Sequence, residues 1–210
     1  MNIIDLLFRV VGSCVRTDHA YAQLAAFCHL LPRLHDGTIP VSIAPISGQY
    51  IGDGLLQIDP KYSRLRARLP LQHVPDILPL AGKSFQIMGQ RIHLGVPQIR
   101  ALAPASALFA RTVTIKHATE APAFIAAARK QLDALNIGGQ LEIPSGSSGT
   151  HEGEPHRHVM RIKETRIVCF SLLVRDLNPD ESLRLQELGL GGRRRMGGGL
   201  FVPATEELHP

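Results

Sequence analysis

Apolar residues in the first half of the chain predict one complete alternation of strands and helices. Residues 3–15 have the pattern of a strand. A helix is predicted to start at Thr17 and Asp18, which can cap its first turn, and to end at Gly37. The remaining predicted elements of this half are strands over residues 39–46, 55–58 and 64–69, a short helix over 71–80 and a hairpin over 85–96. Together they give the order β-α-β-β-α-β.

The second half repeats this order without repeating the sequence. A strand over residues 111–116 precedes a helix over 119–135, and a hairpin over 159–174 turns at Glu164-Thr165. A second helix starts at Asn178 with proline at its first position, and a final short strand follows it. The pattern predicts an α+β fold of two tandem ferredoxin-like (RRM-like) βαββαβ domains.

Two stretches without hydrophobic periodicity divide the chain further. Residues 101–107 are predicted to link the domains, which we place at residues 1–103 and 104–210. Residues 144–155 are rich in serine and glycine, and they are predicted to form a mobile insertion in the second domain.

A loop of glycine and arginine joins the last helix to the last strand. Its glycines and arginines are Gly189, Gly191, Gly192, Gly197, Gly198, Gly199, Arg193, Arg194 and Arg195. Glycine lets main-chain N–H groups approach an anion closely, and arginine binds phosphate oxygens bidentately. A flexible, solvated basic loop is the alternative. Because ordered elements flank the loop on both sides, we predict a fixed loop that binds a phosphate backbone.

Composition and charge favour a globular protein with a polyanionic partner. The 210 residues are 44% hydrophobic, enough for one or two cores, and the formal net charge is +5. The apolar runs are too short to span a bilayer and do not have the pattern of a signal peptide, so a cytoplasmic location without a membrane partner is expected. Cys14, Cys28 and Cys169 lie in apolar contexts without short spacing, and we expect buried free thiols.

The glycine spacing resembles that of the CRISPR-associated endoribonucleases that cut precursor CRISPR RNA within each repeat. In this family, two G-x-G units separated by five residues precede a final apolar strand, and the matching positions here are Gly189, Gly191, Gly197 and Gly199. The segments that look like one compact subtype of the family are residues 18–21, 34–36, 78–83 and 187–197. The resemblance therefore covers nearly the whole chain.

The resemblance implies a reaction that needs no metal and no cofactor. The ribose 2′-OH attacks the adjacent phosphorus in line and the 5′-oxygen of the next nucleotide leaves, which gives 2′,3′-cyclic phosphate and 5′-OH products. The implied partners are the stem-loop of the CRISPR repeat, the mature crRNA, and other Cas proteins of an interference complex in which the protein remains on its product.

The resemblance also places the catalytic groups on or just after the first helix. His19 is expected in the first turn, away from the core stripe, where the helix dipole favours a neutral imidazole. Tyr21 either assists by hydrogen bonding or covers a core edge, and His29 is either catalytic or an ordinary surface residue. His35 either transfers protons, for which histidine is suited near neutral pH, or caps helix carbonyls. Lys116 is a candidate for the cation that stabilises the transition state.

Basic residues in two further places are candidates for RNA binding. With few aromatic residues for base stacking, recognition is expected to use the RNA backbone and 2′-OH groups. The candidates are Arg157, Arg161, Lys163 and Arg166 of the second-domain hairpin, and Arg64, Arg66 and Arg68, which share one strand face. A solvated face is an equally good interpretation of the last three.

Histidines crowd the segment that precedes this hairpin. His151, His156 and His158 lie close to Glu152 and Glu154, which invites a metal site. No second ligand cluster has helical or Cys-x-x-Cys spacing, so we predict no metal, and contact with RNA is the alternative.

Two other functions are compatible with the sequence. One is a non-catalytic guide-RNA-binding subunit of the same fold, which would bind the repeat with equal affinity and without cleavage whether or not His19 and His35 are present. The other is an unrelated ferredoxin-like enzyme with a small anionic substrate, which would have no affinity for repeat RNA in a gel shift.

Overall fold

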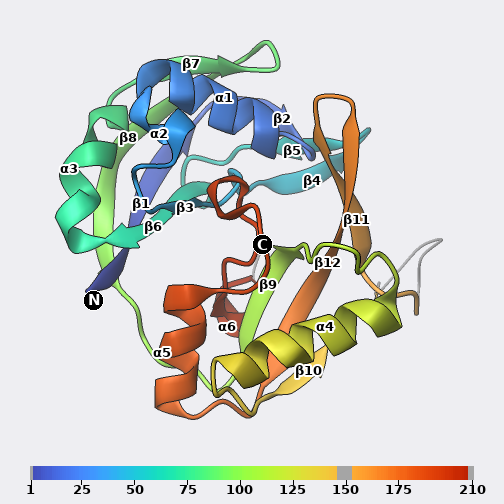
Figure 1. Cartoon of the computed structure of the whole chain (residues 1–210). Helices are drawn as coiled ribbons and strands as arrows, with labels where there is room; N and C mark the ends of the chain where they lie inside the picture. Colours follow the sequence, from blue (N-terminus) through green and yellow to red (C-terminus); the bar gives the residue numbers. More distant parts are fainter. Residues whose placement is uncertain (1, 146–152, 208–210) are drawn as a thin grey trace. The chain divides into compact units, whose positions relative to one another are not determined.

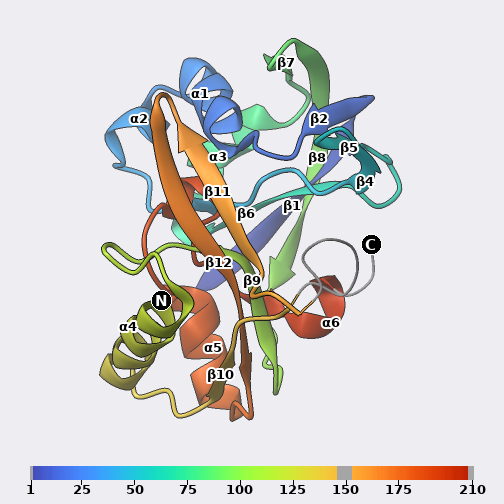
Figure 2. The same ribbon diagram turned by 90° about the vertical axis from the view of Figure 1, so that its right-hand side faces the viewer.

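A computed structural model describes residues 2–145 and 153–207, which form two compact units with mixed helix and strand content (Figures 1 and 2). Unit 1 contains the residues up to Leu102 together with Arg195–Gly197. Unit 2 contains Ala103–Arg194 and the residues from Gly198 onward. In the described part of the chain, no helix is both long and apolar enough to cross a membrane.

Unit 1 is built on an antiparallel sheet in the order β3-β6-β1-β8-β7, beside a small sheet in the order β2-β5-β4. Its strands are β1 (Ile3–Val11), β2 (Cys14–Arg16), β3 (Ser42–Ile43), β4 (Gln49–Gly52), β5 (Leu55–Gln57), β6 (Arg64–Pro70), β7 (Ser84–Ile87) and β8 (Gln90–Ala101). Its helical segments are α1 (Ala20–Leu30), α2 (Arg33–Asp36), α3 (Val74–Ile77) and the 3-10 turns η1 (Leu71–His73) and η2 (Leu78–Leu80).

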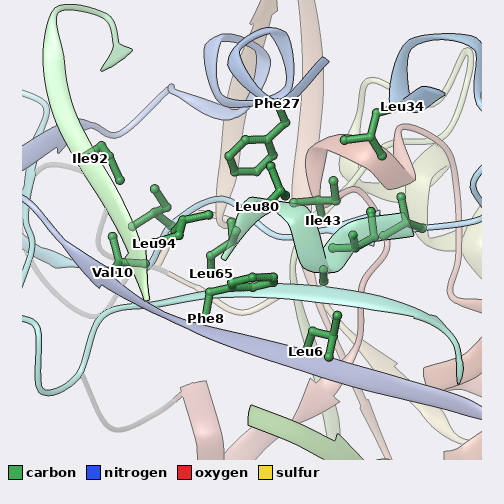
Figure 3. Close-up of a cluster of buried hydrophobic side chains, with 14 of the residues drawn as sticks. Leu6, Phe8, Val10, Phe27, Leu34, Ile43, Leu65, Leu80, Ile92 and Leu94 are labelled. Atoms are coloured by element: carbon green, nitrogen blue, oxygen red, sulfur yellow. The ribbon is translucent and has the colours of Figure 1, made fainter. Parts of the chain in front are cut away.

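The core of unit 1 lies between α1 and one face of the main sheet. Alternate residues of β1, including Phe8, are buried on this face because successive strand side chains point to opposite sides. Figure 3 shows Phe27 of α1 pointing toward the sheet, where Phe8 and Leu65 lie. Phe27 also meets Phe85 of β7 edge to face, with 5.1 Å between ring centroids.

Several elements of unit 1 are shorter than the sequence predicts. The strand predicted over residues 3–15 is interrupted at Gly12, where a Cβ would lie 2.8 Å from the Ile92 side chain. The first helix begins after His19, which takes the N-cap position expected for Thr17 or Asp18, and it stops before Pro32, after which α2 forms separately. The strand predicted over residues 39–46 shrinks to β3.

The arginines of β6 do not form the exposed basic face that alternation suggests. Arg68 is only 3% exposed, and its Nε and Nη2 donate to the two carboxylate oxygens of Asp5 at 2.7 and 2.9 Å. Arg66 Nη1 donates to the same carboxylate at 2.6 Å, and Arg64 donates to main-chain carbonyls of residues 60–63. A buried guanidinium needs such a partner, since an unpaired buried charge is strongly destabilising. The expectation of three exposed arginines is therefore wrong.

Unit 2 has an antiparallel sheet in the order β10-β12-β9-β13, with β11 also paired to β12. Its strands are β9 (Leu108–Val113), β10 (Gln140–Glu142), β11 (Arg157–Ile162), β12 (Thr165–Arg175) and β13 (Val202–Pro203), and its helices are α4 (Ala121–Ala134), α5 (Pro179–Leu188) and α6 (Ala204–Glu207). Helices α4 and α5 lie on the same face of the sheet, and the β11–β12 hairpin extends beyond them (Figures 1 and 2).

Local sequence signals in unit 2 are mostly confirmed. Asn178 caps α5 in a capping box with Glu181, Pro179 is its first residue, and Gly189 ends it. The predicted strand over residues 111–116 is found three residues earlier, as β9. Of the predicted mobile insertion, residues 146–152 lie outside the described part, and Ser145 is bridged to Pro155.

Candidate functional site

His19 is fully buried at the start of α1, which corrects the expectation that it faces away from the core. Its Nδ1 lies 2.6 Å from the Arg16 carbonyl oxygen, and its Nε2 accepts the N–H of Ile46 at 3.0 Å. Gln23 accepts the same N–H and donates to the Ala44 carbonyl. The His19 ring therefore lies between the Arg16 carbonyl and the Ile46 N–H, and with Gln23 it holds residues 44–46 against α1.

The other histidine candidates of unit 1 are exposed. His29 lies in the last turn of α1, and His35 lies in α2, which ends at Gly37 in the left-handed conformation with φ 78°. Tyr21 is half-buried in the first turn of α1. Of the sequence candidates for proton transfer in unit 1, His29 and His35 thus keep imidazoles that a substrate can reach.

The remaining catalytic candidate is Lys116. It is exposed and belongs to unit 2, three residues beyond the end of β9.

Arg195 is bound to the end of α2. Its Nη1 donates to the carbonyl oxygen of His35 at 2.9 Å and also to that of Leu34. The following residue, Met196, is buried, and a Cβ on Gly197 would lie 2.5 Å from Pro45 Cδ. Arg195–Gly197 is therefore packed as part of unit 1. Arg195 binds the main-chain carbonyl of His35, one of the catalytic candidates.

The glycines of the loop allow its backbone to pack closely against neighbouring backbone. The N–H groups of Gly189, Gly191, Gly192, Gly198 and Gly199 donate to protein acceptors, namely Leu185 O, Gln131 Oε1, Thr114 O, Arg193 O and Thr112 O. At Gly199, with φ 63°, a Cβ would lie 1.7 Å from the Leu190 carbonyl oxygen. The expectation that these main-chain N–H groups cradle a phosphate is wrong, because they are already used inside unit 2.

The three consecutive arginines of the loop have different surroundings. Arg194 donates to the carbonyl of Gly199 inside the loop, and Arg195 binds α2 as described above. Arg193 is exposed, with φ 62°. Of the three, Arg193 presents the most accessible side chain to a polyanion.

The β11–β12 hairpin carries the clearest concentration of exposed positive charge. Arg157, Arg161, Lys163 and Arg166 are all exposed, and Lys163 lies at the turn with φ 53°. Arg161 and Arg166 are directly opposite each other in the strand register. This hairpin therefore presents positive charge to solvent.

His156 and His158 lie on the opposite face of β11 from these arginines. His156 Nδ1 is 2.7 Å from Ser171 Oγ, and His158 Nε2 is 3.1 Å from Thr112 Oγ1. Burial, with smaller contributions from His156 and Arg111, lowers the pKa of His158 to about 4. Its Nδ1 is buried without a hydrogen-bond partner among the described residues. His158 is therefore neutral at physiological pH, not a charged contact for RNA.

Residues 2–145 and 153–207 contain no group of three or more His, Cys, Asp or Glu side chains arranged to hold a metal ion. His151 and Glu152 of the histidine-rich segment lie outside these residues.

The low pKa of His158 predicts a loss of stability in mild acid. A histidine whose pKa is lower in the folded state than in the unfolded state stabilises the fold above the unfolded value, near 6.5, and this stabilisation is lost as the pH falls toward 4. The loss should be on the order of 3 kcal/mol in the free energy of unfolding. Urea titrations at several pH values measure it. His158→Gln should lack this component, and an unchanged pH dependence in that variant would contradict the assignment.

Comparison with known proteins gives one consistent group of relatives. The family model described as Cas6 Crispr matches residues 4–206. The CRISPR-associated endonuclease Cas6 of Myxococcus xanthus (strain DK1622) is 38% identical over 203 residues, which cover 97% of this chain and 82% of that protein.

Two solved structures have a similar fold. One, an RAMP protein binding different RNA substrates, has 10% identity and a TM-score of 0.61 over 96% of this chain and 98% of the other. The second, the CRISPR endoribonuclease Cse3 bound to 19 nt RNA, has 11% identity and a TM-score of 0.52 over the same shares of the two chains. At these identities the likeness concerns the fold.

Proposed function

Because the chain belongs to the Cas6 family, we propose that it is an endoribonuclease that binds the stem-loop of a CRISPR repeat and cuts precursor CRISPR RNA into mature crRNA. The observation that carries this proposal is the position of His35. Its side chain is exposed, and its main-chain carbonyl accepts a hydrogen bond from Arg195 of the glycine-arginine loop, whose glycine spacing resembles that of the family. A non-catalytic RNA-binding subunit would have no need for an accessible imidazole fixed in this way.

In the proposed reaction the substrate supplies its own nucleophile. The ribose 2′-OH loses a proton as it attacks the neighbouring phosphorus, and the 5′-oxygen gains one as it leaves, so an acid, a base and a cation suffice without a metal ion. We assign proton transfer to His35, with His29 and Tyr21 on α1 as further groups and Lys116 as the cation. His19 is assigned a structural role, since its ring nitrogens hold the chain at Arg16 and Ile46.

We assign RNA binding to two basic surfaces of unit 2, the β11–β12 hairpin and Arg193. The hairpin arginines are exposed, which suits contact with a phosphate backbone, and binding of this kind releases counterions and weakens with salt. Arg64 and Arg66 already donate to protein acceptors, so we assign them at most a minor part in RNA binding. Retention on the mature crRNA, association with other Cas proteins and a cytoplasmic location belong to the same proposal.

We also infer that each unit is a ferredoxin-like βαββαβ domain, the first carrying the catalytic candidates and the second most of the glycine-arginine loop. With β1, β3, β6 and β8 taken as strands one to four of unit 1, the sheet order is 2-3-1-4, and β9, β10, β12 and β13 give the same order in unit 2. This order with antiparallel neighbours supports the inference.

The proposal predicts that purified protein cuts a synthetic repeat RNA in excess EDTA. The products should carry a 2′,3′-cyclic phosphate, or the phosphate from its opening, and a 5′-OH, because the 2′-OH is the nucleophile. End-labelled RNA on a sequencing gel, with and without phosphatase treatment, identifies these ends. Activity that EDTA abolishes and a divalent ion restores would contradict the mechanism. Tight binding without cleavage would favour the non-catalytic subunit, and no binding would favour an enzyme with a different substrate.

A further inference from the structure

We propose that Arg195 is a positioning residue for His35, so that the glycine-arginine loop controls catalysis by fixing the end of α2. This inference rests on the proposed function, in which His35 transfers protons. It assigns to Arg195 a role different from the phosphate contact that its place in an arginine run suggests.

The first observation is the bond pattern at the end of α2. Arg195 Nη1 donates to the carbonyl of His35 at 2.9 Å and to that of Leu34. A helix leaves its last four carbonyls without partners inside the helix, and α2 has only four residues, so its conformation depends on outside partners. Arg195 donates to two of these carbonyls, those of Leu34 and His35, and His35 is the residue whose imidazole must be placed accurately.

The second observation is that Arg195 is itself fixed. Met196 is buried, and the backbone at Gly197 approaches Pro45 so closely that a Cβ would lie 2.5 Å from its Cδ. The guanidinium is half-buried rather than extended into solvent. Arg195 can hold the end of α2 in one position because Met196 and Gly197, which follow it, are themselves closely packed.

The chemical consequence follows from the sensitivity of proton transfer to distance. An imidazole must lie within hydrogen-bond reach of the proton that it moves, and displacements of about 1 Å can cost on the order of a hundredfold in rate. If the carbonyls of Leu34 and His35 lose Arg195, the four-residue helix loosens and the imidazole samples several positions. The rate of the chemical step then falls while the surfaces that bind RNA stay intact.

The test compares Arg195→Ala and Arg195→Lys with a matched control, Arg184→Ala. Arg184 Nη1 donates at 3.1 Å to the carbonyls of Leu135 and Asn136, just after α4. Arg184→Ala therefore removes the same kind of hydrogen bonds from a helix end that carries no catalytic candidate. Four quantities are measured: the single-turnover rate at saturating repeat RNA, the dissociation constant by filter binding, the NMR signal of the His35 Cε1–H group, and the thermal midpoint of unfolding.

Arg195→Ala should lower the saturating rate by at least about tenfold and change the dissociation constant by less than about threefold. Its His35 signal, assigned by its loss in His35→Ala, should shift or broaden. Arg195→Lys should recover part of the rate, because an ammonium group can also donate to helix carbonyls. Arg184→Ala should lower the thermal midpoint about as much as Arg195→Ala does, because each loses hydrogen bonds to two carbonyls, and it should leave the saturating rate within about twofold.

An unchanged saturating rate in Arg195→Ala would overturn the inference. A weaker dissociation constant with an unchanged saturating rate would also overturn it and would make Arg195 an RNA contact. Equal rate losses in Arg195→Ala and Arg184→Ala would show a general effect of stability and count against positioning. If the wild type does not cut repeat RNA, the proposed function fails, whereas the His35 signal in Arg195→Ala still decides whether Arg195 positions that residue.

Discussion

Alanine in place of His35 should slow repeat cleavage at saturating RNA by roughly a hundredfold to ten-thousandfold and leave the dissociation constant nearly unchanged. The side chain is exposed while its backbone is held by Arg195, so its removal takes away proton transfer without opening a core. Single-turnover kinetics with labelled repeat RNA separate the rate from binding. A variant that cuts at the wild-type rate would exclude His35 and move the assignment to His29.

The matched control for this experiment is His19→Ala, which should behave in the opposite way. His19 is buried with both ring nitrogens bonded, and its loss leaves the Arg16 carbonyl and part of the Ile46 N–H bonding unsatisfied. The thermal midpoint should fall, and the rate per folded molecule should stay within about tenfold. Abolished cleavage in a fully folded His19→Ala protein would restore the catalytic role that the sequence suggested.

A repeat RNA with 2′-deoxyribose immediately upstream of the scissile phosphate should bind and remain uncut. The deoxy nucleotide removes the nucleophile, and without it the proposed reaction has no second route, so the expected loss of cleavage is complete. The backbone charges of the RNA are unchanged, so under the proposed binding by the basic hairpin the affinity should stay within about threefold. A gel shift and a cleavage assay on the same RNA measure both effects.

The control RNA carries the deoxy substitution two nucleotides away from the scissile phosphate and should be cut normally. Continued cutting of the first substrate would mean that water, or a hydroxide bound to a metal, attacks the phosphorus.

The sequence predicted the elements whose formation depends on residues near one another in the chain. The alternation along β6, the capping box of α5 and the hairpin between β11 and β12 all depend on residues close to one another in the sequence, and the structure has them. The glycine spacing pointed to the family because it depends on a few positions in one short loop.

What the sequence could not predict depends on partners far along the chain. No residue near Arg68 in the sequence indicates that it will be buried and paired with Asp5, which is 63 residues away. In the same way, no residue near His19 indicates that its ring will accept the N–H of Ile46. The same limit applies to the arginine run. Three identical residues in a row look equivalent, and only tertiary structure separates Arg193 in solvent from Arg194 in the loop and Arg195 on α2.

The membership of Arg195–Gly197 in unit 1 has a consequence for how the protein can be divided. The linker near Leu102 looks like a natural place for gene fission or for expressing the halves separately. A fragment that ends there contains every strand of unit 1 but lacks the arginine that binds the carbonyls of Leu34 and His35. The N-terminal half is therefore complete as a sheet, but under the proposed function it lacks the residue that positions His35 until synthesis reaches Arg195.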